Sequence, residues 1–291
     1  MNKIYAVIDI GSNSVRLLMS RGEETVDKIT ITTRLSEGMK DGVLTKAAIT
    51  RTVDAVVFLN ETAINGGACS INAFATAAVR NAVNGDEFLQ RIKERCGLNI
   101  DVLSGEEEAK TGYLGALKGK DGGLIDVGGA SSEVIVVKNN NPVYVYSLPV
   151  GAVRVKDICG QDKDKADAFI SEMVKEYGDI PTTDFYSVGG TATTVAAILL
   201  ELDKYDRKKT DGFRVKIGEL KSLADKLFSM TVEERKKIKG LQENRAEIIA
   251  GGVLLLYRIA EKAGIESFRV SESDNLEGYL KEKVLKVEKR N

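Results

Sequence analysis

One pattern occurs twice in this chain and constrains its fold more than any other feature: an apolar strand, an aspartate near its end, and a turn of small residues. The first copy is Ala6–Ser14 (AVIDIGSNS) and the second is Leu124–Glu133 (LIDVGGASSE). Glycine lets the backbone turn sharply, so that several N–H groups approach one anion, and the aspartate can hold a divalent cation directly or through its waters. The repetition predicts two related lobes that face one cleft, with a nucleotide or a chain of phosphates between them.

The length and composition allow two such lobes. With 291 residues, of which 43% are hydrophobic and 29% charged, the chain is long enough for two domains that each bury a core. We place an N-terminal lobe at residues 1–120 and a C-terminal lobe at 121–291, with the glycine-rich segment 118–123 as the hinge. A final helix, from about Asn275 to Val287, is placed so that it can pack back on the first lobe.

Local patterns predict an α/β fold. Ser104 and Glu107 fit a capping box at the start of a helix that runs towards Leu117. A strand near Phe185 runs into a third glycine turn, which opens another helix, and the chain beyond residue 202 is expected to be mostly helical. The other predicted elements are strands at 4–10, 15–20, 71–75, 100–103, 133–137 and 143–148, and helices at 45–66 and 163–177.

The types of charged and metal-binding residue exclude several classes of function. The net charge of −1 shows no basic excess of the kind that nucleic-acid binders carry, and we interpret the lysine-rich runs 204–209 and 235–239 as solvated faces. Three widely spaced cysteines support neither a disulfide framework nor a zinc site. Because the chain has no histidine, its chemistry must depend on carboxylates, hydroxyls and a hard cation such as Mg²⁺.

No part of the sequence indicates a membrane protein. The chain has no apolar run long enough to cross a bilayer, and its first residues do not fit a signal-peptide pattern. We therefore expect a cytoplasmic protein with neither a membrane nor a nucleic acid as its partner.

The two turns supply the candidate binding residues. Asp9 and Asp126 are the candidate metal ligands, and Glu133 follows the second turn closely enough for its carboxylate to reach the same metal. A merely structural turn is an equally good interpretation of either copy alone, and the pair is what favours binding. The candidate phosphate-binding residues are Gly11, Ser12, Asn13, Gly128, Gly129, Ala130, Ser131, Gly189, Gly190 and Thr191.

Two further residues are candidates for catalysis. Glu107 has a sufficient role as the capping partner of Ser104, whereas Glu108 lies about 100° further round the helix and is free to point into a cleft. We assign Glu108 the role of positioning or deprotonating a water molecule. Arg80 follows a strand among small residues, where its guanidinium could hold two phosphate oxygens, although a surface arginine without a ligand is the alternative.

Taken together, these motifs resemble the exopolyphosphatase and guanosine pentaphosphate phosphohydrolase (Ppx/GppA) family, in its short form without a C-terminal helical domain. The resemblance implies two ribonuclease H-like lobes of the actin, sugar-kinase and Hsp70 superfamily. One departure concerns Leu276, because relatives often have arginine before the following Glu-Gly pair. The segments that carry the resemblance are 7–14, 75–82, 104–109, 125–133, 147–151 and 188–192.

The resemblance implies a Mg²⁺-dependent hydrolase that cleaves terminal phosphoanhydride bonds of inorganic polyphosphate or guanosine pentaphosphate. In the family, the carboxylate at the position of Glu108 orients the attacking water. Asp126 and Glu133 match the other acidic residues of the active site, and Arg80 matches an arginine that contacts the phosphates. The resemblance also favours a homodimer.

Two other functions fit the same motifs. One is an ATPase or a small-molecule kinase of the same superfamily, and the other is a sensor that binds nucleotide or polyphosphate without turnover. The sequence does not rank polyphosphate against guanosine pentaphosphate, nor short chains against long ones. Whether a guanosine pocket exists near Gly189 is equally open.

Overall fold

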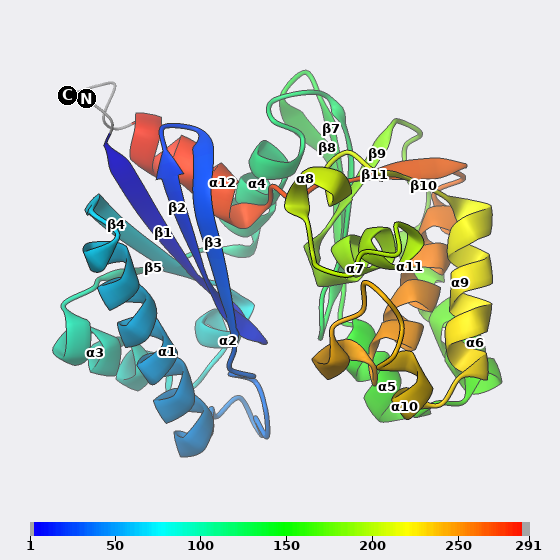
Figure 1. Cartoon of the computed structure of the whole chain (residues 1–291), viewed down its shortest axis with the longest axis horizontal. Coiled ribbons are helices and arrows are strands. Elements are labelled where there is room, and N and C mark those ends of the chain that lie inside the picture. Colours follow the sequence, from blue (N-terminus) through cyan, green and yellow to red (C-terminus); the bar gives the residue numbers. More distant parts are fainter. Residues whose placement is uncertain (1–2, 287–291) are drawn as a thin grey trace. The chain divides into compact units, whose positions relative to one another are not determined.

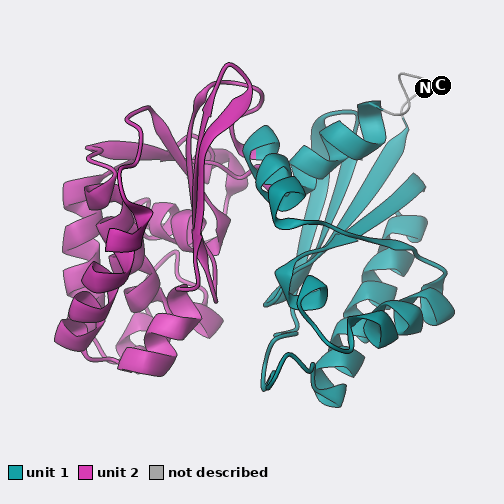
Figure 2. Cartoon of the chain, turned by 180° about the vertical axis from the view of Figure 1, so that it is seen from behind, with its two compact units in different colours: residues 1–115, 275–291 teal, residues 116–274 magenta. Residues whose placement is uncertain are grey.

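The computed structural model describes residues 3–286, which form two compact units (Figure 2). Unit 1 consists of residues 1–115 and 275–291, and unit 2 of residues 116–274. The division falls slightly before the expected boundary at residue 120, and the last described helix belongs to unit 1. The predicted end of that helix, Val287, lies outside the described residues.

Unit 1 is built on a five-stranded sheet in the order β3-β2-β1-β4-β5 (Figure 1). The first three strands of the chain form an antiparallel meander, whereas β4 and β5 continue the sheet parallel to β1. The strands predicted on either side of the first turn therefore pair as a β-hairpin. The strands are β1 Ile4–Ile10, β2 Ser14–Arg21, β3 Glu24–Thr32, β4 Ala68–Ala75 and β5 Ile100–Val102.

Side chains alternate along β1, so both faces of this sheet are apolar and both are covered by helices. Ile8 packs towards α1 and α3, and Val7 packs towards α12 on the other face. Leu276, where relatives often carry arginine, is buried in the second of these cores. The helices of unit 1 are α1 Lys46–Asn65, α2 Ala77–Arg80, α3 Gly85–Cys96, α4 Gly105–Ala116, α12 Asn275–Tyr279 and the π-helical η3 Leu280–Leu285.

Unit 2 repeats the same plan with one additional strand. Its sheet has the order β8-β7-β6-β9-β11-β10, in which β6, β7 and β8 form the antiparallel meander and β9 and β11 run parallel to β6. The prediction of two ribonuclease H-like units is confirmed, since five strands correspond in order and direction. The strands are β6 Gly122–Val127, β7 Ser132–Lys138, β8 Asn141–Leu148, β9 Phe185–Val188, β10 Arg214–Lys216 and β11 Ser267–Val270.

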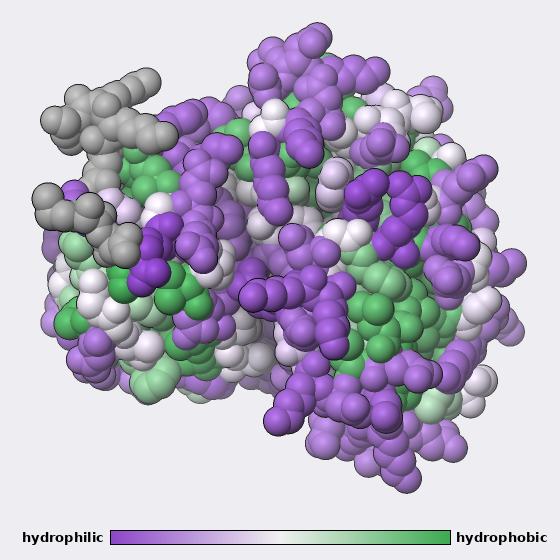
Figure 3. Space-filling model, turned by 45° about the horizontal axis from the view of Figure 1, so that its top comes forward, coloured by the Kyte–Doolittle hydropathy of each residue, from purple (hydrophilic) through white to green (hydrophobic). Residues whose placement is uncertain are grey.

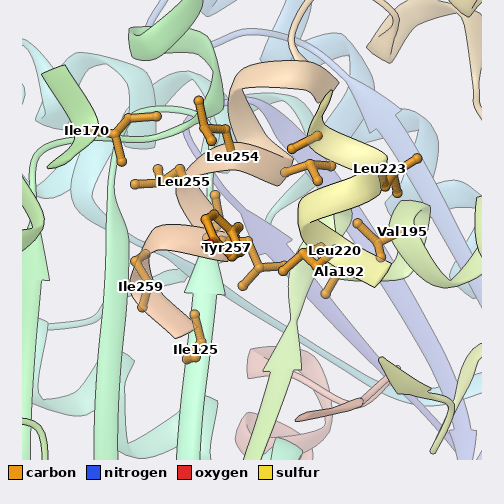
Figure 4. Close-up of a cluster of buried hydrophobic side chains, with 14 of the residues drawn as sticks. Ile125, Ile170, Ala192, Val195, Leu220, Leu223, Leu254, Leu255, Tyr257 and Ile259 are labelled. Carbon is orange, nitrogen blue, oxygen red and sulfur yellow. The ribbon is translucent and has the colours of Figure 1, made fainter. Parts of the chain in front are cut away.

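The core of unit 2 lies between this sheet and a layer of helices (Figure 4). Ile125 of β6 lies near Ile259 of α11, and Leu255 of α11 and Leu220 of α9 belong to the same core. The chain beyond residue 202 is mostly helical, as expected, and it also contributes two short strands, β10 and β11, that the sequence analysis did not predict. The helical elements are α5 Ala152–Cys159, α6 Lys163–Met173, η1 Val174–Tyr177, α7 Gly189–Leu199, α8 Arg207–Thr210, α9 Ile217–Ser229, α10 Val232–Arg235, η2 Glu243–Arg245 and α11 Ile249–Lys262.

Hydrophilic residues dominate the face of the molecule drawn in Figure 3, with apolar residues in patches between them. Within residues 3–286, no helix combines the length and the apolar character that a membrane crossing requires. Arg235 corrects the interpretation of 235–239 as a solvated face, because it is completely buried and donates to the carbonyl of Leu227 at 2.6 Å. The cytoplasmic location and the homodimer stay predictions.

Candidate active site

The first turn, between β1 and β2, is held by a neighbouring loop of unit 1. The N–H of Gly11 donates to the carbonyl of Ser14 at 3.0 Å and closes the turn. The carbonyl of Ser12 accepts from the N–H of Ser36, and the carbonyl of Asn13 accepts from the N–H groups of residues 33 and 34, at 2.8–3.1 Å. In a trans peptide the C=O and N–H point in opposite directions, so the N–H groups of Asn13 and Ser14 face away from that loop.

The second turn, between β6 and β7, is closed by the same hydrogen bond but is supported at different carbonyls. The N–H of Gly128 donates to the carbonyl of Ser131 at 3.0 Å, as Gly11 does in unit 1. The carbonyls of Gly128 and Gly129 accept from the first N–H groups of α5, at 2.9–3.2 Å. The N–H groups of Gly129 and Ala130 therefore point away from α5, towards the side where an anion could bind.

Gly151 makes this contact with α5 possible. A Cβ atom at Gly151 would lie 2.5 Å from the carbonyl carbon and oxygen of Gly129, closer than any side chain tolerates. The glycine of the 147–151 motif is thus explained by close backbone approach to the second turn, although it does not itself lie in that turn.

The strand register places a different pair of charged side chains beside each turn. In unit 1, Asp9 lies opposite Arg16, whose Nε donates to its carboxylate at 3.1 Å. In unit 2, Asp126 lies opposite Glu133. Two carboxylates therefore take the positions that the ion pair Asp9–Arg16 takes in unit 1. The hydroxyl of Ser147 donates to Glu133 at 2.7 Å from the next strand. Like charges in directly opposed positions repel each other, and a bound cation removes that repulsion.

Glu108 and Arg80 meet near the first turn, where β4 leads into α2 and where α4 begins. The Nη1 of Arg80 donates to Glu108 at 2.9 Å and to the carbonyl of Leu103 at 2.6 Å. Burial raises the pKa of Glu108, and the nearby charge of Asp9 raises it further, whereas Arg80 and Thr76 act to lower it. A carboxyl group whose pKa lies above its ordinary value is suited to accept a proton near neutral pH. The capping box of Ser104 and Glu107 is present as predicted.

The third glycine turn lies beside Asp126 in unit 2. Gly189 has a φ of +81°, and a Cβ there would approach the Oδ1 of Asp126 to 2.5 Å, so glycine is required. Gly189, Gly190 and Thr191 are the first residues of α7, where backbone N–H groups have no intrahelical acceptors and favour anions. The hydroxyl of Thr191, however, donates to the carbonyl of Val127 at 3.0 Å and serves the fold.

Two arginines that lie near these turns were not identified in the sequence analysis. Arg16 binds Asp9, as described above. Arg245 follows no recognisable motif, yet its guanidinium lies directly on Gly190 at the start of α7. Burial lowers its pKa, and within residues 3–286 no carboxylate lies within ion-pair distance of it. No sequence signal could have found this residue, since its neighbours Gly190 and Tyr205 are remote in the chain.

The structure therefore gathers the predicted residues into two sets. Unit 1 brings together the first turn, Asp9, Arg80 and Glu108, and unit 2 brings together the second and third turns, Asp126 and Glu133. That both sets face one cleft stays a prediction. Across residues 3–286, no three acidic or cysteine side chains form a ready-made metal cage.

Comparison with known proteins identifies relatives of several lengths. The chain is 30% identical to exopolyphosphatase 2 of Mycobacterium tuberculosis, over 94% of this chain and 96% of that protein. It is 28% identical to a guanosine-5'-triphosphate,3'-diphosphate pyrophosphatase of Aeromonas hydrophila, over 95% of this chain and 58% of that protein. It is also 28% identical to a bifunctional 3-dehydroquinate synthase/phosphatase of Fusobacterium nucleatum, of which it spans 47%.

A solved structure and a family model agree with these relatives. The crystal structure of the Aquifex aeolicus member of the Ppx/GppA protein family superimposes with a TM-score of 0.84 and 28% identity, and 98% of each chain is covered. The model of the Ppx/GppA phosphatase family matches residues 15–287. Because this match includes nearly all of the sequence, the chain belongs to the Ppx/GppA phosphatase family.

Proposed function

We propose that this chain hydrolyses the terminal phosphoanhydride bond of inorganic polyphosphate or of guanosine pentaphosphate, with Mg²⁺ as its cofactor. One observation carries most of the proposal: a glutamate with a raised pKa, paired with Arg80, adjoins a turn whose N–H groups point away from its supporting loop. The names of the relatives, an exopolyphosphatase and a guanosine pentaphosphate pyrophosphatase, support the same chemistry.

The mechanism assigns Glu108 to the attacking water. Its ionised carboxylate accepts a hydrogen bond from that water and then its proton, as the water oxygen bonds to the terminal phosphorus and the bridging oxygen leaves with the shorter chain. Arg80 holds Glu108 through Nη1, so the rest of its guanidinium can offset charge on the transferred phosphoryl group. The N–H groups of the two turns hold the remaining phosphates, and positioning supplies most of the rate.

The carboxylates beside the second turn, in unit 2, suit a Mg²⁺ ion better than the carboxylate beside the first turn, in unit 1. Asp126 and Glu133 oppose each other across the hairpin, and Mg²⁺ is commonly bound by one or two carboxylates together with waters and substrate phosphates. When bound, Mg²⁺ would neutralise charge on the phosphate oxygens. Because Arg16 already binds the carboxylate of Asp9, Asp9 is less suited than Asp126 to hold the metal directly.

Phosphate release from three substrates tests the proposal. The purified chain with Mg²⁺ is incubated with polyphosphate of defined lengths, guanosine pentaphosphate and ATP, and free phosphate is measured over time. Release from the first or second substrate, with ATP left intact, is the expected result. Hydrolysis of ATP alone would favour the ATPase or kinase, and binding without release would favour the sensor.

The pH dependence of that reaction tests the pairing of Arg80 with Glu108. Because burial raises the pKa of Glu108, the rate should fall on the acid side at a higher pH than for an ordinary glutamate. Arg80 opposes this shift, so Arg80→Gln should move the acid limb to still higher pH. Rate–pH profiles of both proteins on the same substrate measure the shift, and a limb that moves to lower pH would contradict the assignment.

A further inference from the structure

A buried tyrosine contacts the strand that leaves the second turn. Tyr177 ends the 3-10 segment after α6 and is 1% exposed. Its hydroxyl donates to the carbonyl of Ser132 at 2.9 Å, and the Oγ of Ser132 lies 2.9 Å from the same hydroxyl. Since a phenol has a single proton, the hydroxyl of Ser132 must donate to Tyr177. The hydroxyl of Tyr177 therefore holds both the backbone and the side chain of Ser132.

Ser132 connects the second turn to the strand that carries Glu133. It is the first residue of β7, directly after Ser131 of the second turn and directly before Glu133. Side chains alternate along a strand, so Ser132 faces the core while Glu133 lies on the opposite face, across from Asp126. Tyr177 thus holds the start of β7 from the face opposite to the candidate metal ligands.

Comparison with unit 1 indicates why this hairpin needs such a contact. The residue that corresponds to Ser132 is Val15, which is fully buried and packs in an apolar core. There the neighbouring pair, Asp9 and Arg16, attract each other and hold the two strands together. In unit 2 the corresponding pair is Asp126 and Glu133, two carboxylates that cannot form such an ion pair with each other.

We infer that Tyr177 is a positioning residue, which fixes the second phosphate-binding turn and Glu133 through its two hydrogen bonds with Ser132. The inference rests on the proposed function, because it concerns the same turn. Burial raises the pKa of Tyr177 and so favours the protonated hydroxyl, which is the form that donates to Ser132.

The test compares Tyr177→Phe with a matched loss of a hydroxyl, Tyr144→Phe. Tyr144 donates to the carbonyl of Tyr177 at 2.6 Å and makes no hydrogen bond with Ser132. Hydrogen exchange of the Gly128 amide, which closes the second turn, reports on the turn directly, and the Gly11 amide of unit 1 serves as an internal control. We expect faster exchange at Gly128 in Tyr177→Phe alone, with Gly11 unchanged in both variants.

Kinetics provide the second measurement. Loss of the two hydrogen bonds should raise the KM for the Mg²⁺–substrate complex roughly five- to tenfold in Tyr177→Phe, with kcat changed far less and with Tyr144→Phe close to wild type. Ser132→Ala, which keeps the carbonyl, should have a smaller effect that does not add to that of Tyr177→Phe.

The outcomes separate the two proposals. Equal exchange at Gly128 in Tyr177→Phe and Tyr144→Phe, with equal KM values, would overturn the positioning role. Faster exchange at Gly128, in a protein whose wild type releases phosphate from no substrate, would support the positioning role and refute the proposed function.

Discussion

Replacing Glu108 by glutamine is expected to lower the rate of phosphate release about a thousandfold, within the usual range for the loss of a general base. Glutamine has nearly the same shape and can still accept a hydrogen bond from Arg80, so the fold should be unaffected. The side chain of Glu108 is 29% exposed, which also argues against a large structural cost. Phosphate release under saturating substrate and a thermal unfolding curve measure the two effects separately.

Glu107 provides the matched control for this prediction. Its carboxylate accepts from the N–H of Ser104 at 3.1 Å and lies 3.3 Å from Lys283, so its role is to cap α4. Glutamine keeps an oxygen that can accept the capping hydrogen bond, so Glu107→Gln should change stability by less than about 1 kcal/mol and leave kcat within about twofold of wild type. If Glu108→Gln retained as much activity as Glu107→Gln, Glu108 would have no part in the chemistry.

Replacing Asp126 by asparagine should remove most of the response of this protein to Mg²⁺. Asparagine keeps one side-chain oxygen but lacks the negative charge that a hard cation prefers in its ligands. With Mg²⁺, the unfolding temperature of wild type should rise with cation concentration, and that of the variant should rise much less. Turnover should fall roughly a hundredfold or more, because the metal contribution is lost.

Asp9 provides the control for this substitution. Its carboxylate is almost fully buried and is bound by Arg16, so Asp9→Asn should destabilise the metal-free protein by about 1–3 kcal/mol. Unfolding curves of both variants with and without Mg²⁺ make the comparison. An unfolding temperature of Asp126→Asn that rises with Mg²⁺ as steeply as that of wild type would contradict the assignment of Asp126 as a metal ligand.

Much of the local structure could be read from the sequence, because it depends on residues close together in the chain. Helix α1 begins where the apolar spacing predicts, and Ser104 with Glu107 forms the capping box that left Glu108 as the candidate base. The two turns were recognisable because glycine and aspartate recur at the same spacing. Their common geometry, with Gly11 and Gly128 making the same hydrogen bond, follows from that local pattern.

The predictions failed where long-range contacts decide the outcome. Strands β10 and β11 are only three and four residues long, and their apolar patterns are too short to separate strand from helix without their neighbours in the sheet. Arg235 lies in a basic run that resembles a solvated face, yet it is buried against carbonyl groups of Leu227 and Ala246. A charge pattern alone cannot show which cation turns inward.

The sequence by itself determined the repeated turn, the α/β elements around it and the acidic residues that a phosphate-cleaving site requires, since each depends on a few neighbouring residues. Only the tertiary structure decided which residues support each turn and which charged side chains lie beside it. Strand register set Arg16 against Asp9 and Glu133 against Asp126, and packing brought Arg245 onto Gly190 and Tyr177 under Ser132. Such pairings join segments far apart in the chain, and their geometry exists only once the sheets have formed.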